Sequence, residues 1–270
     1  MKTMKRVVCA VITCCMLFSM LSISGYAFDD DQNAESVVDI SVAYNWAKDA
    51  GFPIDFLNSI DNELLLAIYK ENAYEDSISV SADHRQMEVT GIPDASSSIM
   101  PVGALSESTL DFWMIASTVA SNGILKKVNV YVYFEWLKAP TLALTDAIYV
   151  NWDGNVFKYK DSTFSEQLKS KQYGSFYSST SFSKTAQGGI GWYCPLTGYK
   201  DVNGSCRFTL EPRDSKLASG TRYKSSIGAH YGHRTISVSG ISFSMSGGEI
   251  QFSGGEVSEI ATTATVQYGK

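Results

Sequence analysis

Three histidines are the side chains of this sequence best suited to acid–base or metal chemistry. His230 and His233 lie three positions apart in the stretch AHYGHR, and His84 lies far away along the chain. The neighbouring glycines favour an extended strand there, in which residues three apart point to opposite faces. Such a pair cannot bind one metal ion. The sequence therefore predicts no metal site, no cofactor and no catalytic histidine.

Motifs for a catalytic nucleophile are equally weak. Ser181 and Lys184 match the SxxK pattern, but that chemistry needs the serine at the start of a helix, and this stretch is typical of a strand or loop. The patterns GxSxG, HExxH and CxxC do not occur. A carboxylate pair for glycoside hydrolysis is defined by its separation in space, so Glu135 and Asp153 stay open as members of one. A hydrolase without a recognisable motif is therefore kept as one alternative function.

Two of the five cysteines, Cys194 and Cys206, lie outside the first 27 residues. In an exported protein, two thiols are most simply joined in one disulfide. The bond would close a loop of about a dozen residues and stabilise the fold by about 3 kcal/mol on the chain-entropy model. The competing interpretation is a pair of free thiols with Cys194 as a nucleophile, and no neighbouring residues support it. The sequence predicts the disulfide.

Tyrosines line one face of the predicted strand VNVYVYFEW (128–136), opposite its apolar face. If this strand pairs with the strand at 146–152, two further polar residues join that face. The predicted ligand-binding surface comprises Tyr131, Tyr133, Glu135, Tyr149 and Asn151. Tyrosines beside hydrogen-bonding groups can hold a sugar ring or a protein. Two other roles stay open, because cross-strand tyrosine pairs stabilise a sheet and because the same face could receive the helices described below.

The N-terminus is typical of a signal peptide. A basic start precedes an apolar run over 7–21, and small residues at Gly25 and Ala27 suit a signal peptidase. The run is too short for a membrane-spanning helix. We therefore predict a signal peptide over 1–27, a disordered polar segment over 28–35, and a secreted, extracellular protein.

The charge of the chain argues against a nucleic-acid partner. Without the signal peptide, 19 basic side chains accompany 28 acidic ones, a net charge of −9. The acidic residues concentrate over 28–100, whereas nucleic-acid binders present a dense basic face. No later segment is apolar enough to span a membrane as a helix. We therefore expect no nucleic-acid partner and no contact with a membrane.

Residues 36–75 are expected to form a helical hairpin. In its first arm the apolar residues recur every four positions, at Val38, Val42, Trp46 and Ala50. Gly51 ends this pattern, and a second arm follows over 53–72 with a break near Ser59, because Asp61 can cap a new turn. The apolar faces must be buried on each other or on the rest of the protein, because a two-helix hairpin has little core of its own.

The segment GFPIDFLNSIDNELLLAIYKE (51–71) resembles helical stretches in uncharacterised secreted proteins of Gram-positive bacteria. The resemblance covers 21 residues. It implies a bacterial exported protein and no particular activity.

Residues 76–270 predict an antiparallel β-sandwich, because many short alternating strands are separated by turn signals. One hairpin is expected over 147–160, with Asp153-Gly154 as its turn and Val150 opposite Phe157.

A second hairpin is expected around Gly247-Gly248, with Met245 opposite Ile250. The apolar alternation that precedes it changes phase at Gly240, which predicts a kink or bulge there.

Together these features predict a mainly β, secreted, non-enzymatic protein that binds an unknown protein or glycan ligand. A membrane-active or pore-forming toxin is the other alternative, because alternating strands rich in serine and threonine can assemble into a barrel.

Overall fold

The computed structural model describes residues 38–90, 107–138, 145–160, 162–170, 174–176, 183–185, 188–196, 202–213, 223–234, 242–246, 249–253 and 257–268. The predicted signal peptide and the polar segment over 28–35 lie outside these residues. The chain divides into two compact units, 1–39 and 40–270, and the elements below all belong to the second unit.

The first helix, α2 (Ile40–Asp49), ends where the sequence predicts. Gly51 adopts a left-handed conformation with φ of 94°. The Gly51 amide donates to the Lys48 carbonyl at 3.1 Å, and the Phe52 amide donates to the Ala47 carbonyl at 3.0 Å. This is a Schellman motif, in which a glycine turns the chain and satisfies the last carbonyl groups of the helix.

The second arm of the predicted hairpin consists of two helices, α3 (Ile54–Ser59) and α4 (Asn62–Asn72). The Asp61 carboxylate accepts a hydrogen bond from the Leu64 amide at 2.7 Å. An aspartate at this position satisfies one of the free amide groups of the first helical turn. The break therefore occurs at the place and for the reason that the sequence predicts.

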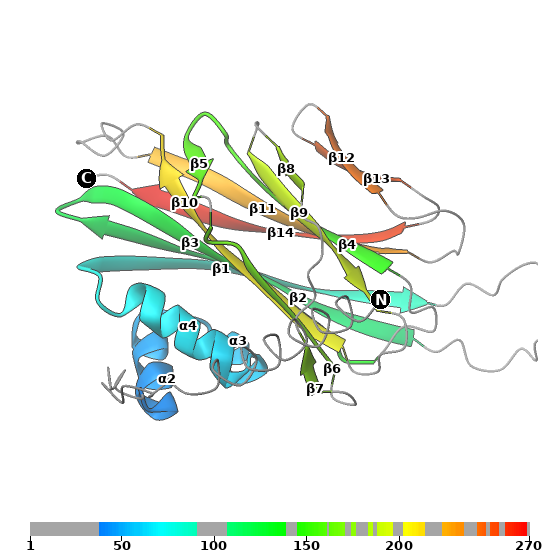
Figure 1. Cartoon of the computed structure of the whole chain (residues 1–270), viewed down its shortest axis with the longest axis horizontal. Helices are drawn as coiled ribbons and strands as arrows, with labels where there is room; N and C mark the ends of the chain where they lie inside the picture. Colours follow the sequence, from blue (N-terminus) through cyan, green and yellow to red (C-terminus); the bar gives the residue numbers. More distant parts are fainter. Residues whose placement is uncertain are drawn as a thin grey trace, which may run out of the picture. The chain divides into compact units, whose positions relative to one another are not determined.

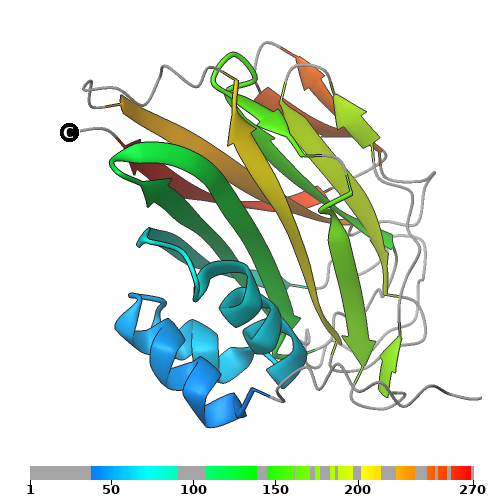
Figure 2. The same ribbon diagram turned by 60° about the vertical axis from the view of Figure 1, so that its left-hand side comes forward.

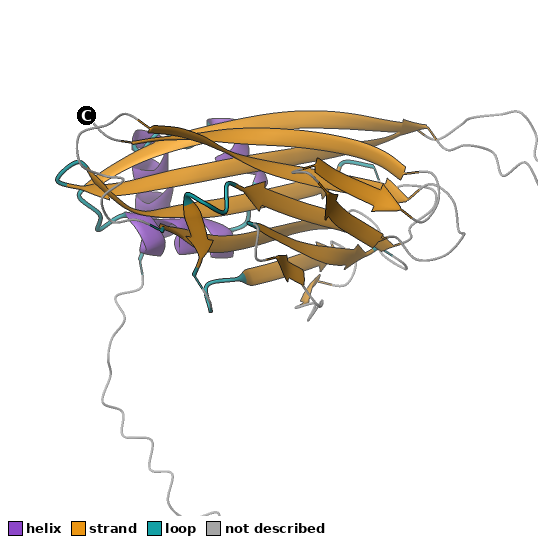
Figure 3. Cartoon of the chain, turned by 90° about the horizontal axis from the view of Figure 1, so that it is seen from above, coloured by secondary structure: helices purple, strands orange, loops and turns teal. Residues whose placement is uncertain are grey.

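Antiparallel strands form the rest of the described chain (Figure 1 and Figure 3). They are β1 (Ser77–Thr90), β2 (Glu107–Ser121), β3 (Ile124–Trp136), β4 (Thr145–Trp152), β5 (Phe157–Tyr159), β6 (Ser165–Ser170), β7 (Gly174–Phe176), β8 (Ser183–Thr185), β9 (Gly189–Pro195), β10 (Val202–Pro212), β11 (Tyr223–Arg234), β12 (Ser242–Ser246), β13 (Glu249–Ser253) and β14 (Val257–Tyr268).

Two of the sheets enclose the core. A seven-stranded sheet has the order β1-β2-β3-β10-β6-β7 with β5 beside β10, and a five-stranded sheet has the order β14-β11-β4-β9-β8. Alternate residues of β3, from Val128 to Trp136, enter one hydrophobic cluster together with residues of β4, β9 and β11. The predicted fold class, a β-sandwich preceded by a short helical segment, is confirmed.

The helices cover the outer face of the seven-stranded sheet (Figure 1 and Figure 2). Phe56 and Leu57 of α3 and Leu64, Leu65 and Ile68 of α4 are buried. The apolar faces of a short helical segment are thus buried on the sheet, as the lack of an independent core requires.

The hairpin predicted over 147–160 is not formed. β4 pairs with β9 and β11, whereas β5 pairs with β10 in the other sheet. The Val156 and Phe157 amides both donate to the Asp153 carbonyl, at 3.0 and 2.9 Å, so the turn carries the chain from one sheet to the other. Because both edges of β4 already have partners, no edge is left for a hairpin strand.

The hairpin predicted around residues 247 and 248 has the predicted register. β12 and β13 pair with Met245 opposite Ile250 and Phe243 opposite Phe252. The kink predicted near Gly240 falls outside the described residues.

Candidate functional site

The predicted tyrosine surface is covered by the helices. Tyr131 and Tyr133 are 1% and 4% exposed. The ring of Phe52 meets Tyr131 edge-on at 6.3 Å, and the ring of Phe56 meets Tyr133 in the same way at 6.3 Å. This face therefore receives the helices, which was one of the open alternatives, and is closed to a ligand.

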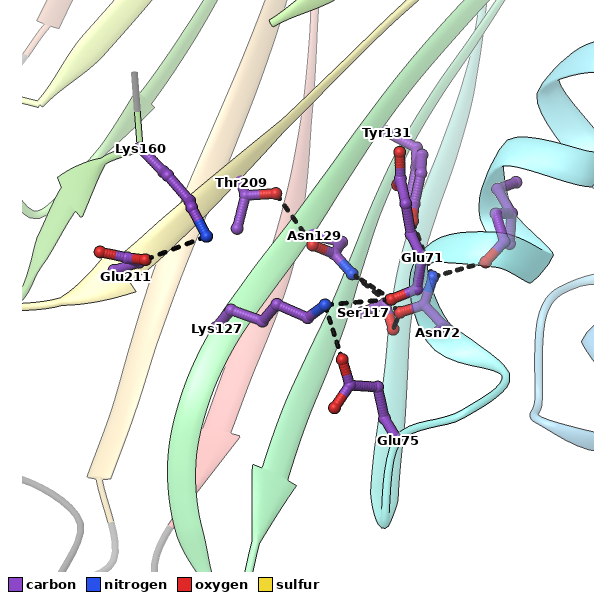
Figure 4. Close-up of polar contacts among 11 residues, drawn as sticks. Glu71, Asn72, Glu75, Ser117, Lys127, Asn129, Tyr131, Lys160, Thr209 and Glu211 are labelled. Carbon is purple, nitrogen blue, oxygen red and sulfur yellow. Dashed lines mark hydrogen bonds and ion pairs between the residues drawn. The ribbon is translucent and has the colours of Figure 1, made fainter. Parts of the chain in front are cut away.

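The hydroxyl groups of these tyrosines bind the helices directly, and Figure 4 shows the surroundings of Tyr131. Tyr131 donates to a carboxylate oxygen of Glu71 at 2.7 Å, and Tyr133 donates to the Ser59 carbonyl at 2.8 Å. Burial raises the pKa of both hydroxyls, and a neighbouring carboxylate raises it further, from Glu71 and Glu135 respectively. Both tyrosines thus stay neutral and are held in place by the helical segment.

Asn72, at the end of α4, is the centre of this buried polar interface (Figure 4). Its side chain is 0% exposed. Its amide group donates to the Ile68 carbonyl and to the Tyr131 hydroxyl, both at 2.8 Å. Its carbonyl oxygen accepts from Ser117 at 2.8 Å and from Asn129 at 3.0 Å. A fully satisfied amide of this kind fixes the orientation of α4 on the sheet.

Charged side chains surround this amide. Glu71 forms an ion pair with Arg207 of β10. Lys127 of β3 donates to the Glu71 carbonyl at 3.1 Å and pairs with the Glu75 carboxylate at 2.7 Å. The docking of the helices is therefore specified by polar contacts as well as by apolar burial.

The remaining predicted ligand-binding residues, Tyr149 and Asn151, belong to the other sheet, so they do not join the tyrosine face. β3 pairs with β2 and β10, and β4 does not adjoin it. Tyr149 is 1% exposed, and its ring lies over Gly189, where an added Cβ would be 1.7 Å from the tyrosine hydroxyl. The five predicted residues therefore do not form one surface, because the strand pairing assumed for them does not occur.

His230 and His233 lie on opposite faces of β11, as predicted. His230 faces outward, with its Nδ1 atom 2.9 Å from the Glu259 carboxylate. His233 faces inward and is 1% exposed, with its Nδ1 atom 2.9 Å from Oδ1 of Asp146. The two rings thus have separate carboxylate partners.

Asp146 joins two buried side chains in the core. Its carboxylate is 0% exposed and accepts a hydrogen bond from the Tyr231 hydroxyl at 2.6 Å. The Tyr231 oxygen accepts in turn from the Trp136 indole of the opposite sheet at 3.0 Å. Burial and then the charge of Asp146 raise the pKa of the Tyr231 hydroxyl. Although His233 and Asp146 resemble a catalytic pair, their burial makes them part of the link between the sheets.

Cys194 and Cys206 are free thiols in this structure, and no disulfide joins them. They lie on β9 and β10, which belong to different sheets. Burial raises the pKa of both thiols, which makes either one a poor nucleophile. The disulfide stays a prediction.

The structure reveals a surface that the sequence analysis missed, on the solvent side of the helices. The Trp46 and Tyr69 rings meet edge-to-face at 5.4 Å, and the Tyr69 and Tyr74 rings do so at 6.1 Å. Tyr74 is 79% exposed, and Val42, one helical turn before Trp46, is 50% exposed. We call these four residues the aromatic patch.

The patch is anchored in the protein through a series of rings. Trp46 contacts Phe52 at 6.2 Å, and Phe52 contacts the buried Tyr131 at 6.3 Å. Loss of hydration, followed by the charge and hydrogen bond of Tyr74, raises the pKa of the Tyr69 hydroxyl. Rings held in this way lose little freedom when a ligand binds.

The patch could not be recognised in the sequence, because the face of α2 that is buried is not the one that the apolar spacing predicts. The spacing of Val42 and Trp46 predicted that both would be buried. In the structure the buried residues are Ala43 and Ala47, each 0% exposed. Small side chains let α2 approach its neighbours closely, whereas Val42 is left exposed and Trp46 is half-buried. Tyr74, which follows α4 in sequence, gave no periodic signal.

Within the described residues, no three histidine, cysteine, aspartate or glutamate side chains are grouped as a metal site would require. The same residues contain no helix with the length and apolar character needed to cross a bilayer.

The comparisons with known proteins leave the family open. No family model and no curated protein matches the sequence. Among solved structures, the collagen-binding subdomain of the Enterococcus faecalis surface protein ACE is 7% identical, with a TM-score of 0.32 over 53% of this chain and 88% of that one. The Staphylococcus aureus collagen adhesin is 8% identical, with a TM-score of 0.28 over 71% of this chain and 81% of that one. The T6 backbone pilin of Streptococcus pyogenes is 6% identical, with a TM-score of 0.31 over 67% of this chain and 35% of that one. The chain is thus distantly similar to β domains of Gram-positive surface proteins, at scores too low to carry an argument about its function.

Proposed function

We propose that this chain is an exported, non-enzymatic interaction protein that binds a protein or glycan ligand through the aromatic patch. The observation that carries the proposal is the exposure of Tyr74, 79%, at the end of a series of rings that is anchored on the sheet. Exposed apolar side chains that gather in one place on a soluble protein commonly mark an interaction site.

The geometry of the patch suits binding. Trp46 and Tyr69 meet at an interplanar angle of 86°, and Tyr69 and Tyr74 meet at 75°. This arrangement leaves ring faces and ring edges turned in different directions, with hydroxyl groups beside them. Aromatic residues of this kind supply much of the binding energy in protein interfaces.

The hydrolase alternative has less support. The carboxylate and imidazole that resemble a catalytic pair, Asp146 and His233, are 0% and 1% exposed. Of the two carboxylates considered for glycoside hydrolysis, Glu135 lies 3.3 Å from the Tyr133 hydroxyl on β3. Asp153 accepts from the Asn155 amide at 2.9 Å in the turn after β4. Each is engaged in its own local structure.

The test is a binding screen with the chain from residue 28 onward, labelled at its C-terminus. The screen uses an array of glycans and a panel of extracellular proteins that includes collagen. We expect at least one ligand to bind. For that ligand, Tyr74→Ala should weaken binding about tenfold or more, because loss of a central aromatic contact commonly costs more than about 1.4 kcal/mol.

Leu137→Ala is the matched control, because Leu137 is also a large apolar residue and is 51% exposed, but follows β3 instead of belonging to the patch. It should leave the affinity unchanged. If Tyr74→Ala and Val42→Ser bind the ligand as well as the unaltered chain does, the patch is not the binding surface. If no ligand binds, the proposed function itself loses its support.

A further inference from the structure

Two thiols enter the core of the sandwich from opposite sheets. Cys194 lies on the inner face of β9 and is 2% exposed, and Cys206 lies on the inner face of β10 and is 1% exposed. Both side chains belong to the one hydrophobic cluster that fills the space between the sheets. Of the five cysteines in the sequence, these are the two that follow the predicted signal peptide.

One contact across the core lies near both cysteines along the strands. The Trp192 ring of β9 packs against the Phe164 ring at 5.8 Å. Cys194 lies two residues after Trp192, on the same face of β9. Glu166 lies two residues after Phe164 and directly opposite Cys206 in the sheet. Cys194 is thus two residues from one side of this contact, and Glu166, the strand partner of Cys206, is two residues from the other side.

The electrostatics of the site agree with this placement. After burial, the charge of the Cys194 thiolate is the largest cause that raises the pKa of Cys206. The Glu166 carboxylate contributes to the raised pKa of both thiols. Charge interactions weaken with distance, so an effect of one carboxylate on both thiols is what two sulfurs on facing inner faces of the sandwich would show.

We propose that Cys194 and Cys206 are oxidised in the exported protein to one disulfide, which joins the two sheets across the core. In the reaction both thiols lose their protons and together lose two electrons, and one S–S bond forms. A disulfide oxidant such as oxidised glutathione accepts the electrons and protons, and its own S–S bond is cleaved to two thiols. Inter-sheet bonds packed against a buried tryptophan occur in other β-sandwiches.

The burial of the thiols determines when the bond can form. The thiolate is the attacking species in disulfide exchange, and it is suppressed in both folded cysteines because burial raises their pKa values. An oxidant also has no path to sulfurs that are 1–2% exposed. Oxidation therefore precedes closure of the sandwich, and a chain that folds in reduced form keeps both thiols.

The experiment compares two treatments of the chain from residue 28 onward. In the first, reduced folded protein is incubated with oxidised glutathione. In the second, the protein is unfolded, reduced and refolded in a mixture of oxidised and reduced glutathione. Each product is then denatured, alkylated with N-ethylmaleimide, digested without reduction and analysed by mass spectrometry.

We expect the folded sample to take two alkyl groups and the refolded sample to take none, with the peptides of Cys194 and Cys206 linked. Cys206→Ser, refolded in the same way, should give no linked peptide and serves as the control. If the refolded chain takes two alkyl groups, or carries glutathione on both cysteines, the inference is overturned. Rapid bond formation in the folded sample would overturn the proposed order of events.

Discussion

Replacement of Asn72 by leucine tests whether polar contacts hold the helices on the sheet. The asparagine makes four hydrogen bonds, to Ile68, Tyr131, Ser117 and Asn129, and is 0% exposed. Leucine has a similar size but can make none of these bonds. The substitution therefore removes a hydrogen-bond partner from Tyr131, Ser117 and Asn129.

The expected magnitude follows from the partners that remain. The Tyr131 hydroxyl still donates to Glu71, and the Asn129 amide keeps a longer contact of 3.4 Å to the Glu71 carbonyl. The Ser117 hydroxyl loses the bond it makes to Asn72 at 2.8 Å. With about 1–3 kcal/mol for the Ser117 hydroxyl left without a partner and about 0.5–1.5 kcal/mol for each further hydrogen bond lost by Tyr131 and Asn129, we expect a loss of about 3 kcal/mol in the free energy of unfolding. For a chain of this length, this lowers the Tm by roughly 6–12 °C.

The assay is urea unfolding followed by circular dichroism, with Asn58→Ala as the control. Asn58 is exposed, and its side-chain oxygen accepts a hydrogen bond from the Tyr44 hydroxyl at 2.9 Å, so its replacement should cost less than about 0.5 kcal/mol. Tyr131→Phe should cost about 1 kcal/mol, because Asn72 keeps its bond to Ile68. The double variant should cost less than the sum of the two single ones. A loss below about 0.5 kcal/mol for Asn72→Leu would refute the reasoning, because the asparagine would then be replaceable by an apolar residue.

Two further predictions concern the core and the five-stranded sheet. Gly189→Ala should destabilise the protein by about 3 kcal/mol in urea unfolding, because its Cβ would lie 1.7 Å from the buried Tyr149 hydroxyl. Gly51→Ala is the control, because no atom lies within 4 Å of the added Cβ. It should cost only the strain of a φ of 94°, about 1 kcal/mol. If Gly189→Ala and Gly51→Ala destabilise the protein equally, the steric argument is contradicted. In the reduced chain, burial raises the pKa of both thiols, so the unfolded state releases their protons first. The stability present below about pH 8.5 should then fall by about 2.7 kcal/mol per pH unit as the pH rises. Once the thiols are oxidised, the free energy of unfolding should begin to decline only near pH 10. At that pH the tyrosines of the unfolded chain ionise, whereas the buried hydroxyls of Tyr131 and Tyr231 in the folded protein do not. If the plots of stability against pH coincide for the reduced and oxidised forms, this account is contradicted.

Structure that depends on neighbouring residues could be predicted well. The break before α4 follows from the carboxylate of Asp61, which caps the amide of Leu64 three residues later. The hairpin of β12 and β13 follows from two glycines between alternating arms, and its register matches the prediction pair by pair. In both cases the interacting groups are close in sequence, so few alternatives compete.

The candidate site could not be predicted, because it depends on groups far apart in sequence. Tyr131 binds Glu71 across 60 residues, and His233 binds Asp146 across 87. The alternation of β3 showed that Tyr131 lies on the outer face of its strand, but not that α4 covers this face. For the same reason no sequence pattern predicts the aromatic patch, because Trp46, Tyr69 and Tyr74 come from α2, from α4 and from the turn after α4.

The sequence by itself determined the class of fold, the end of α2, the start of α4 and the register of the hairpin of β12 and β13, because capping and turn formation are local. The tertiary structure decided which strands became neighbours and which apolar face of α2 was buried. Its alanines pack inward while Val42 stays 50% exposed, and β4 takes β9 and β11 as partners in place of β5. Several faces and edges of this chain are equally suited to burial or pairing, and the choice among them is made only when the whole core is packed.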